Sequence, residues 1–145
     1  MSAPQFKVYS SSAGSGKTYT LTREYLKLAL QSDSPFYFRR ILAITFTNDA
    51  ANEMKERILG ALRHFADEQL GSPVERAASD RLLDSVASEL AAAGNAVSHE
   101  ALRHRARQTY HHLLHQYSDF AVCTIDSFVN RLVSAFSEEL DLPFN

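Results

Sequence analysis

The sequence predicts an α/β fold in which helices flank a parallel β-sheet and a helical segment interrupts the sheet elements. Residues 1–66 and 117–139 alternate short apolar runs with stretches of helical periodicity, a pattern typical of β/α layers. The residues between these two blocks show only helical patterns. We therefore expect an α/β part made of residues 1–66 and 117–145, and a helical insert at residues 67–116.

The first part of the chain predicts two strands, each followed by a helix. A short strand from Phe6 to Ser10 leads through a loop into a helix from Lys17 to about Gln31. The nearly continuous apolar run from Arg40 to Phe46 predicts a second strand, of the kind that is buried in a parallel sheet. Thr47 or Asn48 then caps a second helix.

The later elements are expected to be a helical hairpin followed by a strand and a helix. Gly71-Ser72-Pro73 closes the second helix, and Ser98 caps the longer helix of the hairpin. The chain returns to a strand at about Phe120 to Thr124 and turns at Ile125-Asp126. The last helix carries three apolar residues on one face, Phe128, Leu132 and Phe136.

The composition is that of one globular domain. The chain has 145 residues, of which 45% are hydrophobic and 22% charged, and it contains no run of the roughly 18 apolar residues that cross a membrane. We expect a cytoplasmic protein without membrane contact. The net charge of -2 means that any nucleic-acid binding depends on a local patch. The single Cys123 excludes an internal disulfide and is expected to be a buried strand residue.

A glycine-rich loop between the first strand and the first helix predicts a phosphate-binding site. Glycines let backbone N–H groups approach anionic oxygens, and the helix N-terminus adds its positive end. We expect Lys17 to neutralise the phosphates and the Thr18 hydroxyl to hold Mg²⁺, which makes both catalytic candidates. The binding set is Ser12, Ala13, Gly14, Ser15, Gly16, Lys17 and Thr18. Ser11 stands where the general pattern has glycine, so a plain glycine-serine turn is the alternative.

Two further segments resemble motifs of the UvrD-like superfamily 1 DNA helicases. The segment Ile41 to Arg57 resembles the motif called Ia, and Thr124-Ile-Asp-Ser-Phe128 resembles the next motif, usually Thr-Ile-His-Ser-Phe. The loop without its first glycine is also the form that this family shows. The resemblance implies a partial RecA-like P-loop NTPase fold with a 1B-like insert. It also implies ATP and Mg²⁺ as cofactors and translocation on single-stranded DNA in repair or recombination.

The same resemblance implies a set of DNA-binding residues. They are Thr45, Phe46, Thr47 and Asn48 in the first motif, and Thr124 and Ser127 in the second. Phe46 is the candidate for base stacking, although a core phenylalanine at the end of a buried strand is the alternative. Asp49 and Asp126 replace basic residues or histidine of the family pattern, which weakens the expected DNA contact. Asp126 could instead cap the following helix.

The short start and the helical insert look more like the RecB and AddA helicase-nuclease (ATP-dependent exonuclease) subunits than like UvrD itself. Asp67-Glu68 and Glu138-Glu139 follow helices rather than strands, so we interpret them as solvated helix ends. We expect the acids of ATP hydrolysis to lie past Asn145. On this interpretation the chain is an N-terminal fragment that is inactive alone. Its partners are duplex or single-stranded DNA, the remainder of the motor and a second helicase-nuclease subunit.

Two features leave alternatives open. His111 and His115 lie four residues apart and could ligate a metal, although no accompanying acid is present. With Arg103, Arg105 and Arg107 they form the one locally basic stretch, either a solvated face or a DNA contact. The rival functions are a nucleoside or nucleotide kinase and a non-catalytic DNA-binding module with a degenerate P-loop.

Overall fold

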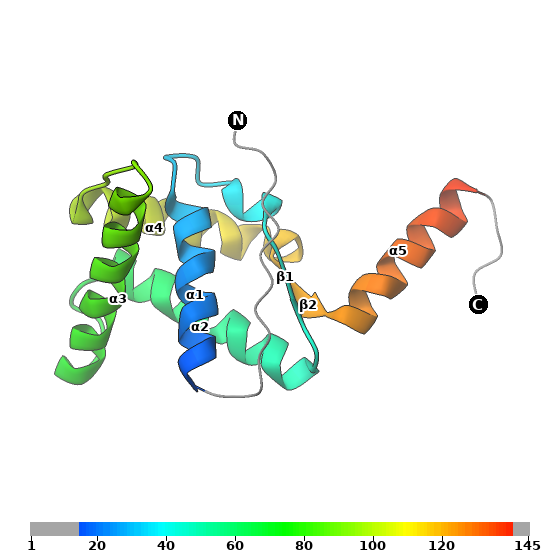
Figure 1. Cartoon of the computed structure of the whole chain (residues 1–145), viewed down its shortest axis with the longest axis horizontal. Coiled ribbons are helices and arrows are strands. Elements are labelled where there is room, and N and C mark those ends of the chain that lie inside the picture. Colours follow the sequence, from blue (N-terminus) through cyan, green and yellow to red (C-terminus); the bar gives the residue numbers. More distant parts are fainter. Residues whose placement is uncertain (1–14, 141–145) are drawn as a thin grey trace.

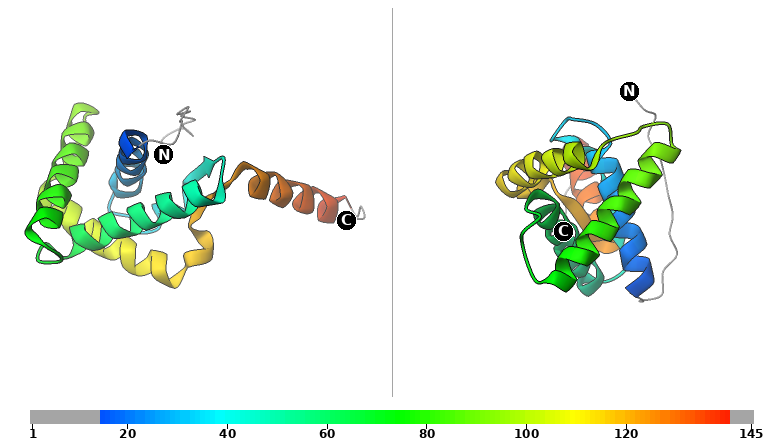
Figure 2. Two further views of the ribbon diagram at one scale, coloured as in Figure 1. Left: turned by 90° about the horizontal axis from the view of Figure 1, so that it is seen from below. Right: turned by 90° about the vertical axis from the view of Figure 1, so that its left-hand side faces the viewer.

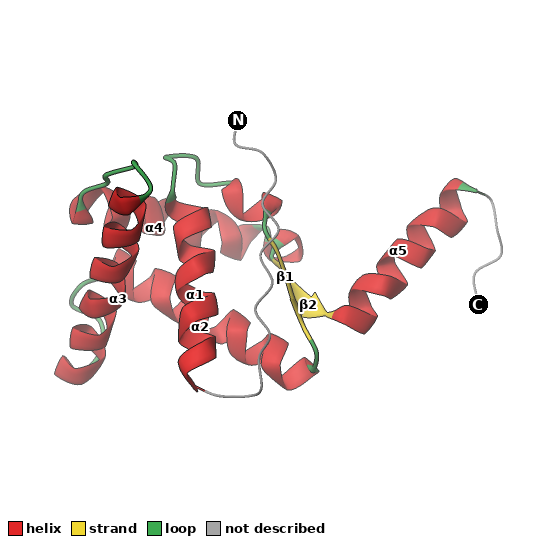
Figure 3. Ribbon diagram, viewed as in Figure 1, coloured by secondary structure: helices red, strands yellow, loops and turns green. Residues whose placement is uncertain are grey.

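The fold is helix-rich, with a small parallel sheet. The structure is a computed structural model and is described for residues 15–140, with side chains from residue 18 onward, so the expected strand at 6–10 lies outside the described residues. Five helices are present in this part: α1 (Ser15–Leu30), α2 (Asn48–Ala66), α3 (Pro73–Ala92), α4 (His99–His115) and α5 (Ile125–Glu139). Two strands, β1 (Leu42–Thr45) and β2 (Ala121–Thr124), and two short 3-10 turns complete it (Figures 1 and 3).

The two strands are far apart in the sequence and adjacent in space. β1 and β2 pair in parallel with Leu42 opposite Ala121 and Thr45 opposite Thr124, and the helices α2 to α4 make the connection. One face of the pair packs on the core, where Val122 is 2% exposed. On the other face Leu42 and Ile44 are 47% and 43% exposed. The expectation of a strand buried on both faces is therefore wrong for the described part, because helices cover only one face of the pair.

Helices α1 to α4 share one hydrophobic core. Its fully buried side chains include Leu26 of α1, Leu62 of α2, Val86 of α3 and Leu102 of α4. Val122 of β2 belongs to the same cluster. The separation of residues 67–116 as an insert stays a prediction, since their apolar residues pack into this common core. Among the described residues, no helix has the length and apolar character needed to cross a membrane.

Side-chain caps define where three of the helices begin. Thr47 accepts a hydrogen bond from the Ala50 N–H at 3.1 Å, and Ser98 accepts one from the Ala101 N–H at 3.1 Å, which confirms both predicted caps. Gly71-Ser72-Pro73 does not close α2, which ends at Ala66. Ser72 instead caps α3 and Pro73 is its first residue, the place where a missing N–H costs nothing.

The basic residues of α4 hold the ends of two other helices. Arg105 donates to the Leu30 carbonyl at 3.0 Å, at the C-terminus of α1. Arg103 and Arg107 donate to carbonyls at the end of α2, of Phe65 at 3.2 Å and of Ala66 at 3.3 Å. Guanidinium groups at helix C-termini satisfy free carbonyls and oppose the helix dipole. These arginines are therefore engaged in the fold, and a plain solvated face does not describe them.

An ion-pair network joins α1 to α3. Lys27 lies 2.8 Å from Glu89 of α3 and 3.3 Å from Glu24 of its own helix, while Arg23 lies 3.4 Å from Glu89. Although burial lowers the pKa of Lys27, its hydrogen bonds with Glu89 and Glu24 raise the pKa above the ordinary lysine value. The network fixes α1, whose N-terminus carries the predicted phosphate loop.

Helix α5 projects away from the other helices (Figures 1 and 2). It begins directly after β2 with Thr124 as its cap, so the predicted turn at Ile125-Asp126 and the predicted Asp126 cap are both wrong. None of its residues is fully buried. Phe128 is half-buried, whereas Leu132 and Phe136 are exposed. The predicted core face is thus open along most of its length.

Candidate nucleic-acid and nucleotide site

The carboxyl ends of β1 and β2 lie side by side. Thr45 is opposite Thr124 in the parallel register, and each strand leads into a helix, β1 through Phe46 and Thr47, and β2 directly. Parallel strands that end together place the residues after them at one edge of the sheet. The two motif-like segments therefore meet at a single edge, which we call the strand-end edge and define as residues 45–48 and 124–127.

Threonine hydroxyl groups organise the strand-end edge. The Thr124 hydroxyl accepts from the Ser127 N–H at 3.2 Å and donates to the Ser127 hydroxyl at 3.0 Å. The Thr45 hydroxyl donates to the Thr47 carbonyl at 3.1 Å and lies 3.5 Å from the Cys123 carbonyl. Thr124 is only 6% exposed, so its side chain shapes the edge from within. Cys123 is buried in β2, as predicted.

Phe46 stands out from the strand-end edge. Its side chain is 76% exposed, at the end of a strand whose neighbouring residues are half-buried or exposed. The alternative of a core phenylalanine is therefore wrong. Thr47, Asn48 and Ser127 are exposed as well. All six predicted DNA-binding residues come together here, while their contact with DNA stays a prediction.

A pocket of about 320 Å³ opens between α2, β2 and α5, next to this edge. Its polar lining includes Asn48, Asn52, Lys55, Tyr117, Ser127 and Arg131. Four of these, Asn52, Lys55, Tyr117 and Arg131, were missed by sequence reasoning. Residues 48, 52 and 55 lie at steps of four and three on α2, and residues 127 and 131 lie at a step of four on α5, so helical spacing was an available signal.

The predicted phosphate loop is described only from its last residues. Ser12, Ala13 and Gly14 lie outside the described residues, while Ser15, Gly16 and Lys17 form the start of α1. Thr18 is half-buried, and its carbonyl accepts from the Thr22 hydroxyl at 2.8 Å. The first turn of α1 contains no acidic residue, so nothing in that turn repels an anion at the helix N-terminus. The N-terminal ends of α1 and α2 lie on the same side of the molecule, the lower side in Figure 1.

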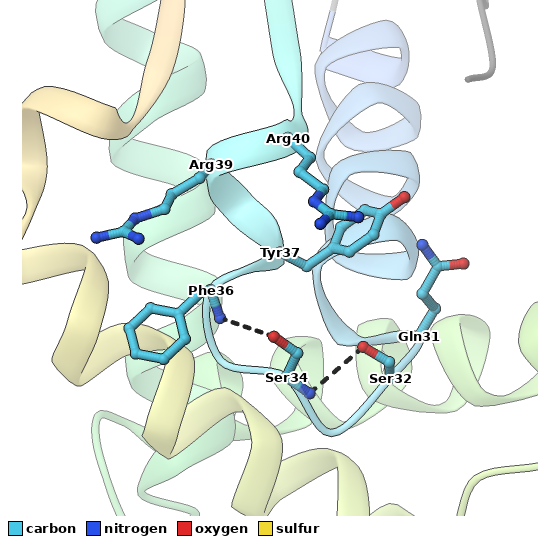
Figure 4. A pocket seen from close by; sticks show the side chains of 7 residues that line it. All are labelled: Gln31, Ser32, Ser34, Phe36, Tyr37, Arg39 and Arg40. Carbon is cyan, nitrogen blue, oxygen red and sulfur yellow. Dashed lines mark hydrogen bonds between the residues drawn. The ribbon is translucent and has the colours of Figure 1, made fainter. Parts of the chain in front are cut away.

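A second pocket lies at the opposite end of β1, where α1 ends (Figure 4). It is lined by Ser32, Ser34 and Phe36 among others, and the Ser34 hydroxyl accepts from the Phe36 N–H at 3.5 Å. Arg39 lies 3.3 Å from Asp119, contacts Gln116 and covers the Phe36 ring. Its charge is therefore already matched by a carboxylate.

The acids and histidines that sequence reasoning left aside have simple positions. Asp67 ends α2 and its carboxylate accepts from the Gln69 N–H at 3.1 Å, and Glu138-Glu139 lie at the end of α5. Both pairs are helix ends, as predicted. The rings of His111 and His115 lie 4.3 Å apart, and His115 Nδ1 lies 2.8 Å from the His111 carbonyl. Within the described range, no group of three or more metal-ligating side chains occurs.

Comparison with known proteins assigns the family. The model of the UvrD/REP helicase N-terminal domain matches residues 4–144. The chain belongs to this family. The match spans both motif-like segments and the helices between them, so the resemblance inferred from the motifs is confirmed. The helix-rich α/β fold with its parallel strand pair agrees with part of a UvrD/REP helicase N-terminal domain.

Curated relatives of this UvrD/REP helicase N-terminal domain are named as the A-type subunit of an ATP-dependent helicase/nuclease. The protein of Thermoanaerobacter sp. (strain X514) is 42% identical over 59 residues, which is 41% of this chain and 5% of that protein. The protein of Acetivibrio thermocellus is 40% identical over 63 residues, or 43% of this chain and 5% of its own length. The protein of Bacillus cereus (strain AH820) is 41% identical over the same number of residues, 63, with the same coverage of 43% and 5%.

These names match the helicase-nuclease subfamily that the short start and the helical middle predict. The matched segment spans only about 5% of the length of the curated relatives. No solved structure matches the chain.

Proposed function

We propose that this chain forms the ATP-binding part of an ATP-dependent DNA helicase that moves along single-stranded DNA in repair or recombination. The observation that carries the proposal is the strand-end edge, where two helicase motifs distant in sequence meet at adjacent parallel strands. Membership of the UvrD/REP helicase N-terminal domain family supports the same function. For the full-length protein, the names of the relatives favour a helicase that works together with a nuclease.

The DNA side of the proposal rests on Phe46. A 76% exposed aromatic ring at the end of a strand offers a flat surface on which a base can stack. Base stacking on aromatic rings contributes about 1–3 kcal/mol per base and does not depend on the identity of the base. Asn48 and Ser127 lie beside Phe46 with exposed polar groups that can bind the sugar-phosphate chain. Such contacts suit a motor that moves over every sequence.

Two acids limit the strength of this contact. Asp49 lies in the first turn of α2 and Asp126 in the first turn of α5, and both are exposed. An acid at this position stabilises its helix through the helix dipole but repels a nearby phosphate. We therefore propose weak, sequence-independent binding of single-stranded DNA.

The nucleotide side rests on the loop that precedes α1. Lys17 and Thr18 would hold the phosphates and the Mg²⁺ ion of bound ATP, with backbone N–H groups of residues 12–16 completing the cradle. The start of α1 fits this role because its first turn has no acid. Bound ATP would supply the free energy of phosphate hydrolysis. The chain's own residues bind and orient the phosphates and neutralise their charge.

The proposal is tested by measuring binding of the full chain to a labelled oligothymidylate. Phe46→Ala should weaken binding by about 1–3 kcal/mol, and by the same factor for oligonucleotides of other sequences. Phe36→Ala is the matched control, since Phe36 is an exposed phenylalanine at the opposite end of β1. Equal affinities of the Phe46 and Phe36 variants would overturn the stacking assignment.

A further inference from the structure

We infer that the pocket between α2, β2 and α5 is a binding site for one phosphate group of the nucleic-acid backbone, with Lys55 and Arg131 as its cations. This inference rests on the proposed DNA-binding function and adds a defined subsite to it. The pocket adjoins the strand-end edge, because Asn48, Thr124 and Ser127 belong to both. A strand whose base stacks on Phe46 therefore has its backbone next to the pocket.

The local charge of the pocket is positive although the chain is acidic overall. The net charge of the chain is -2, yet the pocket-lining residues include Lys55 and Arg131 and no carboxylate. Within the described part of the chain, neither of these two cations has an ion-pair partner. An uncompensated pair of cations in a hollow concentrates positive potential where an anion can approach.

The other pockets of the described chain lack this property. The pocket at the end of α1 contains Arg39, whose charge is matched by Asp119 at 3.3 Å. A third pocket, beside α3, is lined by the carboxylates of Glu68, Asp80 and Asp84. A backbone phosphate would be repelled there. Comparison of the three hollows therefore singles out the one beside the strand-end edge.

Neutral donors surround the two cations. Asn48 and Asn52 line the α2 wall, and the Ser127 hydroxyl lies on the α5 wall. The Lys55 ammonium lies 5.9 Å from the centre of the Tyr117 ring, a cation–π distance that holds the lysine at the rim. Amide, hydroxyl and cationic donors together satisfy several oxygens of one phosphate.

The floor and size of the pocket select a phosphate rather than a base. Phe120, Val122 and Cys123 of the β2 region are buried and form an apolar floor. They offer no side-chain partner for the hydrogen-bonding edge of a base. The volume of about 320 Å³ is open to solvent between α2 and α5, so a phosphate can enter while its chain continues outside. The site therefore recognises backbone charge and not sequence.

The test compares the salt dependence of oligonucleotide binding in the full chain and in the double variant Lys55→Gln/Arg131→Gln. Binding of an oligothymidylate of about 15 nucleotides is measured by fluorescence anisotropy between about 50 and 200 mM NaCl. Loss of one phosphate contact should reduce the slope of log K against log salt by about 0.7. Affinity should fall by the same factor for every sequence.

Three further samples make the result decisive. Arg81→Gln removes an exposed cation on α3, far from the pocket, and should keep the wild-type slope. The charge-preserving variant Lys55→Arg/Arg131→Lys should restore the slope that the glutamine variant loses. Thermal unfolding of each variant monitors folding. An unchanged slope in the double glutamine variant, with Phe46→Ala still weakening binding, would overturn the subsite and leave the proposed function intact.

The source of the phosphate is distinguished by titration with ATP. If the glutamine double variant bound ATP more weakly but kept the oligonucleotide slope, the pocket would be a nucleotide site and the inference would be wrong. Absence of oligonucleotide binding by the wild-type chain would overturn the DNA function and the subsite together. A reduced slope with unchanged ATP affinity is the expected result.

Discussion

Thr45 and Thr124 lie opposite each other at the ends of two parallel strands, and the Thr45 hydroxyl reaches within 3.5 Å of the carbonyl of Cys123. This pairing joins two segments that are 79 positions apart in numbering, from 45 to 124. The turn that carries Phe46 and the start of α5 are thereby held as one unit. A change at either threonine is expected to affect both segments.

Removal of the cap of α5 should loosen that helix. Thr124→Ala deletes the oxygen that accepts from the Ser127 N–H and should destabilise the helix by about 1 kcal/mol. Since α5 has no fully buried residue, the loss should appear as fraying of this helix rather than global unfolding. Hydrogen exchange of the α5 amides measures it. Thr124→Ser keeps the acceptor oxygen, and equal exchange in the Ala and Ser variants would contradict the capping role.

Arg105 should matter for stability and not for DNA. Arg105→Ala leaves the Leu30 carbonyl without its 3.0 Å donor at the end of α1, at a cost of about 1–2 kcal/mol in unfolding free energy. Urea unfolding measures the cost, with the exposed Arg81→Ala as control. Oligonucleotide affinity should not change. A variant with normal stability and weakened DNA binding would show instead that α4 contacts DNA.

Three glycines should respond differently to replacement by alanine. Gly60 lies inside α2 with open space around it, so Gly60→Ala should stabilise the protein by about 0.5–1 kcal/mol. Gly94 has φ of +83° and also faces open space, so its alanine variant bears only backbone strain of about 1 kcal/mol. Gly71 has φ of +87°, and an added Cβ would meet Glu75 and His64.

The expected order of unfolding midpoints is therefore Gly60→Ala highest, then wild type, then Gly94→Ala, with Gly71→Ala lowest. Urea unfolding of the four proteins gives the order directly. A Gly71 variant as stable as the Gly94 variant would mean that Glu75 and His64 move aside at no cost.

The two faces of the strand pair should differ in their sensitivity to truncation. Ile41 is 7% exposed and Ile44 is 43% exposed, so the same isoleucine-to-alanine change removes very different buried area. Ile41→Ala should cost about 2–5 kcal/mol, as for a core residue, while Ile44→Ala should cost about 1 kcal/mol or less. Urea unfolding of the two variants checks this. Equal losses would mean that the second face is covered in solution.

Local patterns predicted the helices of this protein well, because helical periodicity and caps depend on residues close in sequence. Thr47 and Ser98 begin their helices where the sequence predicts. The family motifs likewise identified the residues that meet at the strand-end edge. Both kinds of signal lie within a few neighbouring positions, and both are reproduced in the fold.

The features that sequence reasoning missed depend on distant partners. The carbonyls that Arg103, Arg105 and Arg107 hold lie 38 to 75 residues away, so a basic stretch was all that local patterns could indicate. The exposed face of Ile44 reflects which neighbours cover the sheet, and strand periodicity carries no such information. Lys55 and Arg131 meet in one pocket only because β1 and β2 pair across the intervening helices.

The most direct test of the central proposal is Mg²⁺-dependent binding of ATP by the full chain and by its Lys17→Ala variant. Lys17 begins α1 as part of the predicted phosphate loop, and loss of its charge should remove the main neutralising group for the phosphates. Isothermal titration of both proteins, with Arg81→Ala as the control for loss of an unrelated cation, gives the affinities. We predict that the wild-type and Arg81 proteins bind ATP and that the Lys17 variant does not. Equal ATP affinity in all three proteins would contradict the proposed nucleotide site.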